Sequence, residues 1–176
     1  MLNLALVGFM GSGKSTVGKQ LAEELDLIYV DTDALVEAKA GMPIPEIFAK
    51  QGEAAFRELE REVVLELCRE THLVMATGGG AFINPSVREA LLRSSLVAYL
   101  DAPFETLWER IRGDAGRPLL SGEGAYDRAR ALYQSRLPIY RTAHVTVDAS
   151  RPADEVVREL LEVYHAHRRQ AQPRLG

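Results

Sequence analysis

The sequence is poor in cysteine, lacks long apolar runs and carries no excess of positive charge. Its one cysteine, Cys68, excludes an internal disulfide and favours a reducing, cytoplasmic setting. Acidic residues number 25 against 21 basic ones, so a formal charge of −4 gives no basic field for nucleic acid or anionic lipid. No apolar run approaches the roughly 20 residues of a membrane span, and no basic segment precedes a long apolar stretch as in a signal peptide. The composition predicts a cytoplasmic protein without nucleic-acid or membrane partners.

The length and composition fit a single globular domain. A chain of 176 residues with 47% hydrophobic side chains can bury a sizeable core without dividing into several domains. We therefore predict one domain over residues 1–176 and expect a monomer. Residues 168–176 are mostly polar and contain Pro173, so we expect a frayed tail there.

Short apolar runs alternate with amphipathic stretches along the chain. This alternation predicts an α/β fold whose parallel sheet has helices on both faces. Two segments interrupt it: residues 33–57 should form short helices with tight corners, and the glycine-rich residues 113–124 should form a mobile flap. The expected strands are residues 2–7, 27–31, 73–77, 96–101 and 144–147. The expected helices are residues 16–25, 56–70, 86–93, 104–111, 125–140 and 153–167.

A glycine-rich stretch follows the first expected strand. Residues 8–15 read GFMGSGKS and fit the phosphate-binding pattern G-x-x-x-x-G-K-[ST], between an expected strand and an expected helix. In such a loop, backbone N–H groups converge on phosphate oxygens at a helix N-terminus, a lysine reaches the terminal phosphates and a hydroxyl can bind Mg²⁺. The pattern predicts a phosphate-binding site that takes Mg²⁺, with Ser15 as a metal ligand; a chance glycine turn is the alternative. The expected nucleotide contacts are Gly11, Ser12, Gly13, Lys14, Ser15 and Thr16.

Two carboxylates follow the second expected strand, in Asp31-Thr32-Asp33. Ligands of open parallel sheets bind beyond the carboxyl ends of the strands, so both carboxylates should face the phosphate-binding loop. Asp31 could hold Mg²⁺ through water, and Asp33 could face an acceptor substrate. The alternative is that Asp33 caps the next helix and Asp31 is simply solvated.

Glycines follow the third expected strand, and an aspartate ends the fourth. Gly78, Gly79 and Gly80 have no side chains, which would let a ligand approach backbone N–H groups; a flexible turn is the alternative. Asp101 stands just before Ala102-Pro103, and we expect it to cap the helix that begins near Pro103.

Three arginines occur near these segments or in the expected flap. Arg57, Arg117 and Arg136 each offer the permanently charged, bidentate group that binds carboxylate or phosphate. Each could instead be one partner of a surface ion pair. Glu60, three residues after Arg57, could be such a partner or could hold Arg57 in place.

Taken together, these segments resemble the shikimate kinase family. The phosphate-binding pattern is shared with many kinases, whereas D-T-D, F-R-x-x-E, G-G-G and R-P-L-L in combination are specific. The motifs occur in family order and cover nearly the whole chain. The matching segments are residues 8–18, 31–33, 48–60, 77–80, 117–120 and 133–140.

The resemblance implies ATP-dependent phosphorylation of the 3-hydroxyl of shikimate, in aromatic amino-acid biosynthesis. It also implies a fold like that of nucleoside monophosphate kinases, with a five-stranded parallel sheet. A substrate-binding segment would span residues 33–60 and a lid would span residues 113–124.

The resemblance also assigns the acceptor contacts. Arg57 and Arg136 would clamp the shikimate carboxylate. Asp33 would bind ring hydroxyls and orient or deprotonate the nucleophile, while Gly79 and Gly80 would add backbone contacts.

On the nucleotide side, the resemblance gives Arg117 a place in the lid, from which it would come down onto the phosphates. Only four residues, Gly-Asp-Ala-Gly, precede it in the expected lid, so further lid cations are not supported here. Arg110 and Arg151 are expected to contact the nucleotide by position alone.

Two rival functions share the phosphate-binding loop. A kinase for another small polyol acid, such as gluconate, would not explain the combined F-R-x-x-E and Tyr-x-x-Arg patterns. A catalytically silent nucleotide-binding module would not be expected to keep Lys14, Ser15, Asp31, Asp33 and Arg117 together.

Overall fold

Five parallel strands form the centre of the molecule in a computed structural model that describes residues 2–113 and 122–171. The strand order is β2-β3-β1-β4-β5, so the first strand lies in the middle of the sheet. Leu6 of β1 lies opposite Ala76 of β3 on one side and Ala98 of β4 on the other. The strands are β1 (Asn3–Val7), β2 (Ile28–Asp31), β3 (Leu73–Ala76), β4 (Ser95–Asp101) and β5 (Val145–Asp148).

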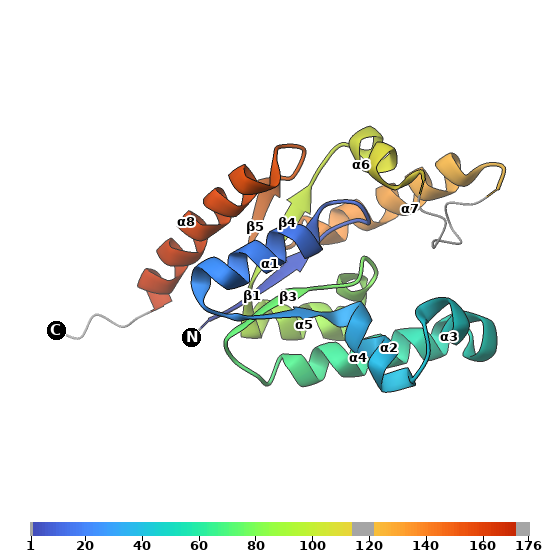
Figure 1. The fold of residues 1–176 in the computed structure, drawn as a ribbon, viewed down its shortest axis with the longest axis horizontal. Coiled ribbons are helices and arrows are strands. Elements are labelled where there is room, and N and C mark those ends of the chain that lie inside the picture. Colours follow the sequence, from blue (N-terminus) through green and yellow to red (C-terminus); the bar gives the residue numbers. More distant parts are fainter. Residues whose placement is uncertain (1, 114–121, 172–176) are drawn as a thin grey trace.

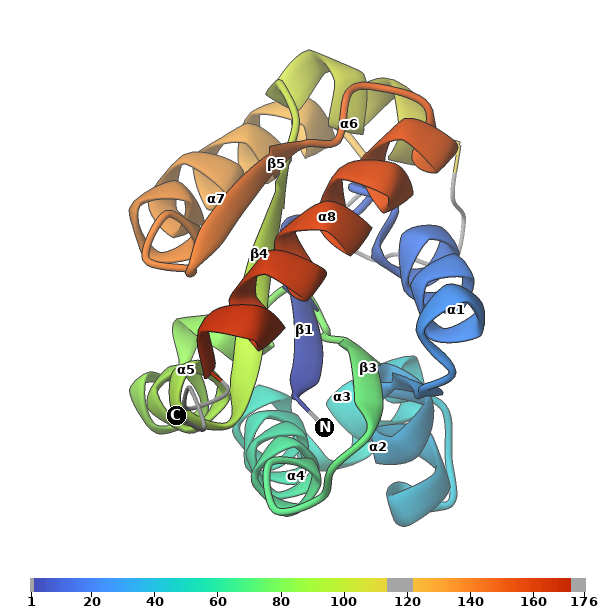
Figure 2. The same cartoon turned by 90° about the vertical axis from the view of Figure 1, so that its left-hand side faces the viewer.

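Helices cover both faces of the sheet (Figure 1; Figure 2). Helices α1 and α8 pack on one face around the fully buried Leu21 and Leu160, and α5, α6 and α7 help to bury the other face. The helices are α1 (Lys14–Leu25), α2 (Thr32–Ala40), α3 (Ile44–Gln51), α4 (Glu53–Leu67), α5 (Pro85–Ser94), α6 (Phe104–Ile111), α7 (Ala125–Tyr140) and α8 (Ala153–Ala171). The predicted α/β fold with a five-stranded parallel sheet is confirmed, and each strand begins and ends within one residue of its expected bounds.

Helices α2, α3 and α4 gather in one corner of the molecule and have a small core of their own (Figure 1). Val36, Ile47, Phe56 and Val63 are buried against one another there. The short helices and tight corners expected over this stretch are present, and α4 begins three residues earlier than the expected residue 56. This corner presents Asp33 and Arg57 from two different helices.

One helix cap differs from the expectation for Asp101, and another differs from the alternative considered for Asp33. Asp31, rather than Asp33, caps α2, because its Oδ1 accepts hydrogen bonds from the backbone N–H groups of Asp33 and Ala34. The expectation that Asp101 caps α6 is wrong: the N-cap is Pro103, and the Asp101 carboxylate instead accepts a hydrogen bond from the Tyr99 hydroxyl at 2.8 Å. The Asp101 side chain therefore bonds to a partner on the sheet, which the local capping pattern does not predict.

The last helix extends further than expected. Helix α8 continues to Ala171, so residues 168–171 are helical rather than part of the frayed tail, and residues 172–176 lie outside the described residues. Its buried residues Val156, Leu160 and Tyr164 recur at helical spacing, which anchors the helix on the sheet. Across residues 2–113 and 122–171, the helices are too short or too polar for any of them to cross a membrane.

Candidate active site

The phosphate loop, residues 8–15, joins β1 to α1. Gly13 is the N-cap of α1, so the cap itself puts no side chain between an anion and the first N–H groups of the helix. Lys14 is the first residue of α1, and its Nζ donates to the carbonyl oxygens of Gly8 at 2.8 Å and Phe9 at 3.1 Å. The ammonium group is therefore held over the loop that would cradle phosphate.

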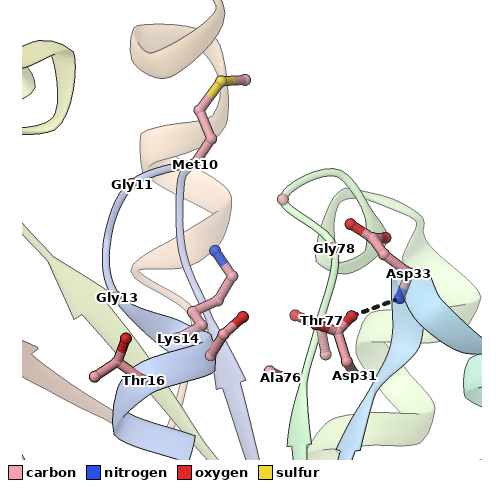
Figure 3. A pocket seen from close by; sticks show the side chains of 12 residues that line it. Met10, Gly11, Gly13, Lys14, Thr16, Asp31, Asp33, Ala76, Thr77 and Gly78 are labelled. Atoms are coloured by element: carbon pink, nitrogen blue, oxygen red, sulfur yellow. Dashed lines mark hydrogen bonds between the residues drawn. The ribbon is translucent and has the colours of Figure 1, made fainter. Parts of the chain in front are cut away.

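A cavity of about 240 Å³ opens beside the phosphate loop. Figure 3 shows Lys14 on one side of it and Asp31 and Asp33 on the other. The arrangement follows from topology, because parallel strands bring the residues after β1, β2 and β3 to one edge of the sheet. The predicted contact residues that line the cavity are Gly11, Gly13, Lys14, Ser15, Thr16, Asp31, Asp33 and Gly79.

Asp33 extends from the first turn of α2 toward the loop formed by Gly78, Gly79 and Gly80, here called the glycine loop. A carbon at the Cβ position of Gly78 would lie 2.5 Å from Oδ1 of Asp33 and 2.8 Å from Oε1 of Glu60. Only a residue without a side chain fits between these two carboxylates. The glycine loop therefore packs closely against the carboxylates of Asp33 and Glu60 and is not merely a flexible turn.

Arg57 and Glu60 form an ion pair within α4. Nη1 of Arg57 lies 2.8 Å from Oε2 of Glu60, whose side chain is only 3% exposed. Burial raises the pKa of the Glu60 carboxyl, Arg57 opposes that rise, and the neighbouring Asp33 adds to it. A Cβ on Gly80 would overlap the Arg57 guanidinium, so this arginine also lies against the glycine loop.

Helix α7 brings a second arginine to the same loop. A Cβ on Gly79 would lie 3.4 Å from Nη1 of Arg136, and Tyr140, one turn further on, donates its hydroxyl hydrogen to the Gly79 carbonyl oxygen. Arg57 and Arg136 come from helices far apart in the sequence, yet Arg57 lies against Gly80 and Arg136 against Gly79. Asp33, Arg136 and Arg57 therefore lie against successive residues of the glycine loop, and of these three side chains Asp33 lines the cavity.

The chain is similar to known proteins in sequence and in fold. A family model described as shikimate kinase matches residues 10–165. The chain belongs to the shikimate kinase family. The predicted resemblance is confirmed.

Individual shikimate kinases match nearly the whole chain. The one from Symbiobacterium thermophilum is 48% identical over 165 residues, which cover 92% of this chain and 95% of the relative. One from Thermus thermophilus is 43% identical over 166 residues, covering 93% and 90%. A solved structure of shikimate kinase from Acinetobacter baumannii in complex with shikimate has a TM-score of 0.90 at 40% identity, covering 95% of this chain and 94% of that chain.

The likeness to a gluconokinase is weaker. The structure of that enzyme from Sinorhizobium meliloti 1021 has a TM-score of 0.61 at 20% identity. Such a match concerns the fold alone, so it gives the rival polyol-acid function no support at the level of side chains.

The arginines expected near the nucleotide are placed differently from each other. Arg110 of α6 donates to the carbonyl oxygens of Gly11 at 3.1 Å and Ala149 at 3.0 Å, so it bridges the phosphate loop and the turn after β5. Arg151 pairs with Glu159 and does not belong to the cavity wall that the described residues form. Arg117 and most of the predicted lid over residues 113–124 lie outside the described residues.

One residue that supports the candidate site was not predicted. The hydroxyl of Thr32, which is fully buried, accepts a hydrogen bond from the Gly78 N–H at 3.0 Å. It ties the segment that carries Asp33 to the glycine loop. The only sequence signal was its place between two aspartates, which does not identify its partner.

Proposed function

We propose that this chain transfers the γ-phosphoryl group of ATP to the 3-hydroxyl of shikimate, a step of the shikimate pathway of aromatic amino-acid biosynthesis. The observation that carries the proposal is a cavity lined by the phosphate loop and Asp33, beside a glycine loop against which two arginines lie, in a member of the shikimate kinase family. The solved A. baumannii shikimate kinase is in complex with shikimate. Shikimate has the carboxylate and hydroxyls that these groups would recognise.

The donor side of the cavity binds and polarises the nucleotide. Backbone N–H groups of the phosphate loop and the N-terminus of α1 would hold the phosphates, with Ser12, Gly13 and Thr16 at the contacts. Lys14 would turn from the carbonyl oxygens of Gly8 and Phe9 to the terminal phosphates and stabilise charge in the transition state. Arg117, from the lid, would add a second cation.

Ser15 and Asp31 fit a magnesium site. Both line the cavity and offer the hydroxyl and carboxylate oxygens that Mg²⁺ prefers. Asp31 uses only Oδ1 for its two capping bonds, so its carboxylate is oriented before any metal binds. No cluster of three or more acidic, histidine or cysteine side chains suited to a metal occurs in residues 2–113 and 122–171, so phosphates and water would complete the coordination. Bound Mg²⁺ would neutralise phosphate charge.

The acceptor side orients the nucleophile. Arg57, held by Glu60, and Arg136 would bind the acceptor carboxylate, which places the ring against Gly79 and Gly80. Asp33 would accept a hydrogen bond from the reacting hydroxyl and take its proton as the new O–P bond forms and the bond to the leaving ADP oxygen breaks. Holding both substrates in line supplies much of the rate.

We also propose that the monomer is the active unit, since the phosphate loop and the glycine loop meet at one cavity within a single protomer, and that the enzyme works in the cytoplasm. Sedimentation velocity of the active enzyme tests the first statement: activity confined to a larger species would contradict it.

An ADP-release assay across three acceptors tests the function. We expect turnover with MgATP and shikimate, little with gluconate or nucleoside monophosphates, and shikimate 3-phosphate as the product by ³¹P NMR. Turnover of gluconate with none of shikimate would assign the site to another polyol acid. Nucleotide binding with no turnover of any acceptor would favour the silent module.

A further inference from the structure

Tyr140 connects the end of α7 to the middle of the glycine loop. Its side chain is fully buried, and its hydroxyl makes a short hydrogen bond to the carbonyl oxygen of Gly79, 61 residues away in the sequence. Helix α7 is also the helix that carries Arg136, one turn earlier. A single hydroxyl thus joins two parts of the acceptor side.

The Tyr140 ring has little freedom to move. It stacks on Tyr99 with ring centroids 5.2 Å apart and an angle of 20° between the planes. Tyr99 is itself buried, and its hydroxyl donates to Asp101 at 2.8 Å. The hydroxyl of Tyr140 is therefore presented to the glycine loop from a rigid part of the core.

Several charges face the Tyr140 hydroxyl. Burial raises its pKa to about 12, Arg136 and Arg57 act against the rise, and Glu60 adds to it. The hydroxyl consequently keeps its proton near neutral pH and remains a hydrogen-bond donor. Both arginines assigned to the acceptor lie close enough to influence it.

The peptide unit between Gly79 and Gly80 transmits this contact. In a planar trans peptide the C=O and N–H bonds point in opposite directions, so a carbonyl held at Tyr140 directs the Gly80 N–H away from Tyr140. Because glycines have no side chains to anchor them, the loop is held by hydrogen bonds to its backbone. Thr32 holds the Gly78 N–H, and Tyr140 holds the Gly79 carbonyl.

We propose that Tyr140 is a positioning residue for the acceptor: its hydrogen bond to Gly79 holds the backbone of the glycine loop in the orientation that binds shikimate. This inference rests on the proposed function. It assigns Tyr140 no contact with substrate; the residue acts through the Gly79–Gly80 peptide unit.

The test is Tyr140→Phe, with Tyr164→Phe as its matched control. Tyr164 is equally buried and its hydroxyl also donates to a backbone carbonyl, that of Leu2 at 2.7 Å, but on the opposite face of the sheet. Each change removes one hydroxyl and keeps the ring. For Tyr140→Phe we expect the KM and Kd for shikimate to rise about tenfold, equal to about 1.4 kcal/mol. The KM for ATP and kcat should stay within about threefold, and Tyr164→Phe should leave all four constants unchanged.

Hydrogen exchange of the ligand-free proteins provides a second readout. Amides of residues 78–80 should exchange faster in Tyr140→Phe than in the wild type or in Tyr164→Phe. Unchanged exchange, or faster exchange with an unchanged shikimate KM, would overturn the proposal. Equal kinetic losses in both variants would also overturn it, since the cause would be general destabilisation. Failure of the proposed function looks different: the wild-type chain itself would not turn over shikimate.

Discussion

The donor and acceptor sides of the cavity are built in contrasting ways. The donor side is one continuous stretch, residues 8–15, in which a strand, a loop and a helix N-terminus follow one another. The acceptor side combines Asp33, the Arg57–Glu60 pair, the glycine loop and Arg136, which come from four separate segments. The donor side is built from neighbouring residues, whereas the acceptor side exists only after the chain has folded.

This difference predicts how each side responds to change. A substitution on the donor side should remove a charge and leave the acceptor side undisturbed. On the acceptor side, Asp33 and Glu60 both crowd Gly78, and both arginines crowd the other two glycines, so one change should propagate to several contacts. Five substitutions, from the largest expected effect to the smallest, and one control variant test this contrast.

Asp33→Asn should have the largest effect. The amide keeps the size of the side chain, but it cannot take the proton of the reacting hydroxyl, so kcat should fall by roughly 10²–10⁴-fold. Steady-state kinetics measures this, and the Kd for MgADP should stay unchanged because the donor side is intact. A kcat close to that of the wild type would reduce Asp33 to a binding contact.

Lys14→Ala should be the largest change on the donor side. Removing a preorganised cation from the phosphates should lower kcat by about 10²–10³-fold, while the Kd for shikimate in the absence of nucleotide stays the same. Circular dichroism and thermal unfolding serve as controls for the fold. Weakened shikimate binding would show that the two sides are coupled and would contradict their independent response to substitution.

Arg57→Ala and Arg136→Ala should weaken acceptor binding selectively. Each removes a charge-assisted contact worth about 1.5–3 kcal/mol, so the shikimate Kd by calorimetry should rise roughly 10–150-fold with little change for ATP. Arg57→Ala should also destabilise the fold, because it leaves the buried Glu60 without its ion-pair partner.

Arg61→Ala is the control for Arg57→Ala. Arg61 lies on the same helix and pairs with the exposed Glu58 at 2.5 Å. Its loss should leave both substrates unaffected. Unchanged shikimate affinity in both site variants would make Arg57 and Arg136 structural.

His144 should give the smallest effect, away from both sides of the cavity. Its Nδ1 accepts a hydrogen bond from the Val97 N–H at 3.0 Å. Burial, followed by the charge of His167, lowers the pKa of His144 below its usual 6.5. Because the folded state favours the neutral ring, this contribution to stability is complete above about pH 6.5 and is lost as the pH falls through the lower, folded-state pKa.

Thermal unfolding between about pH 7.5 and pH 5 measures this loss. His144→Asn keeps an acceptor for Val97 without a titrating ring, so its Tm should fall less over that range than the Tm of the wild type. The difference should stay below about 4 °C, the shift for 1 kcal/mol in a chain of this size. Identical pH profiles would remove His144 as the cause, and kinetic constants at neutral pH should not change.

The parallel sheet and the phosphate loop can be predicted from the sequence alone. Alternating apolar runs predict strands to within one residue, because burial on both faces of a parallel sheet leaves a continuous hydrophobic signal. The phosphate loop is equally readable, since its function depends on backbone geometry that neighbouring residues encode. The family was also recognisable from motifs in order, although a motif does not say which side chains touch.

The contact partners of the polar side chains depend on the tertiary structure. Asp31 and Asp33 are two residues apart and chemically identical, yet one caps α2 and the other turns to Gly78. Asp101 was expected to cap a helix, but it bonds to Tyr99, and Tyr140 reaches a glycine carbonyl 61 residues away. Side-chain partners are chosen by which groups the packed helices bring within about 3 Å. That distance depends on the whole fold and not on the neighbouring sequence.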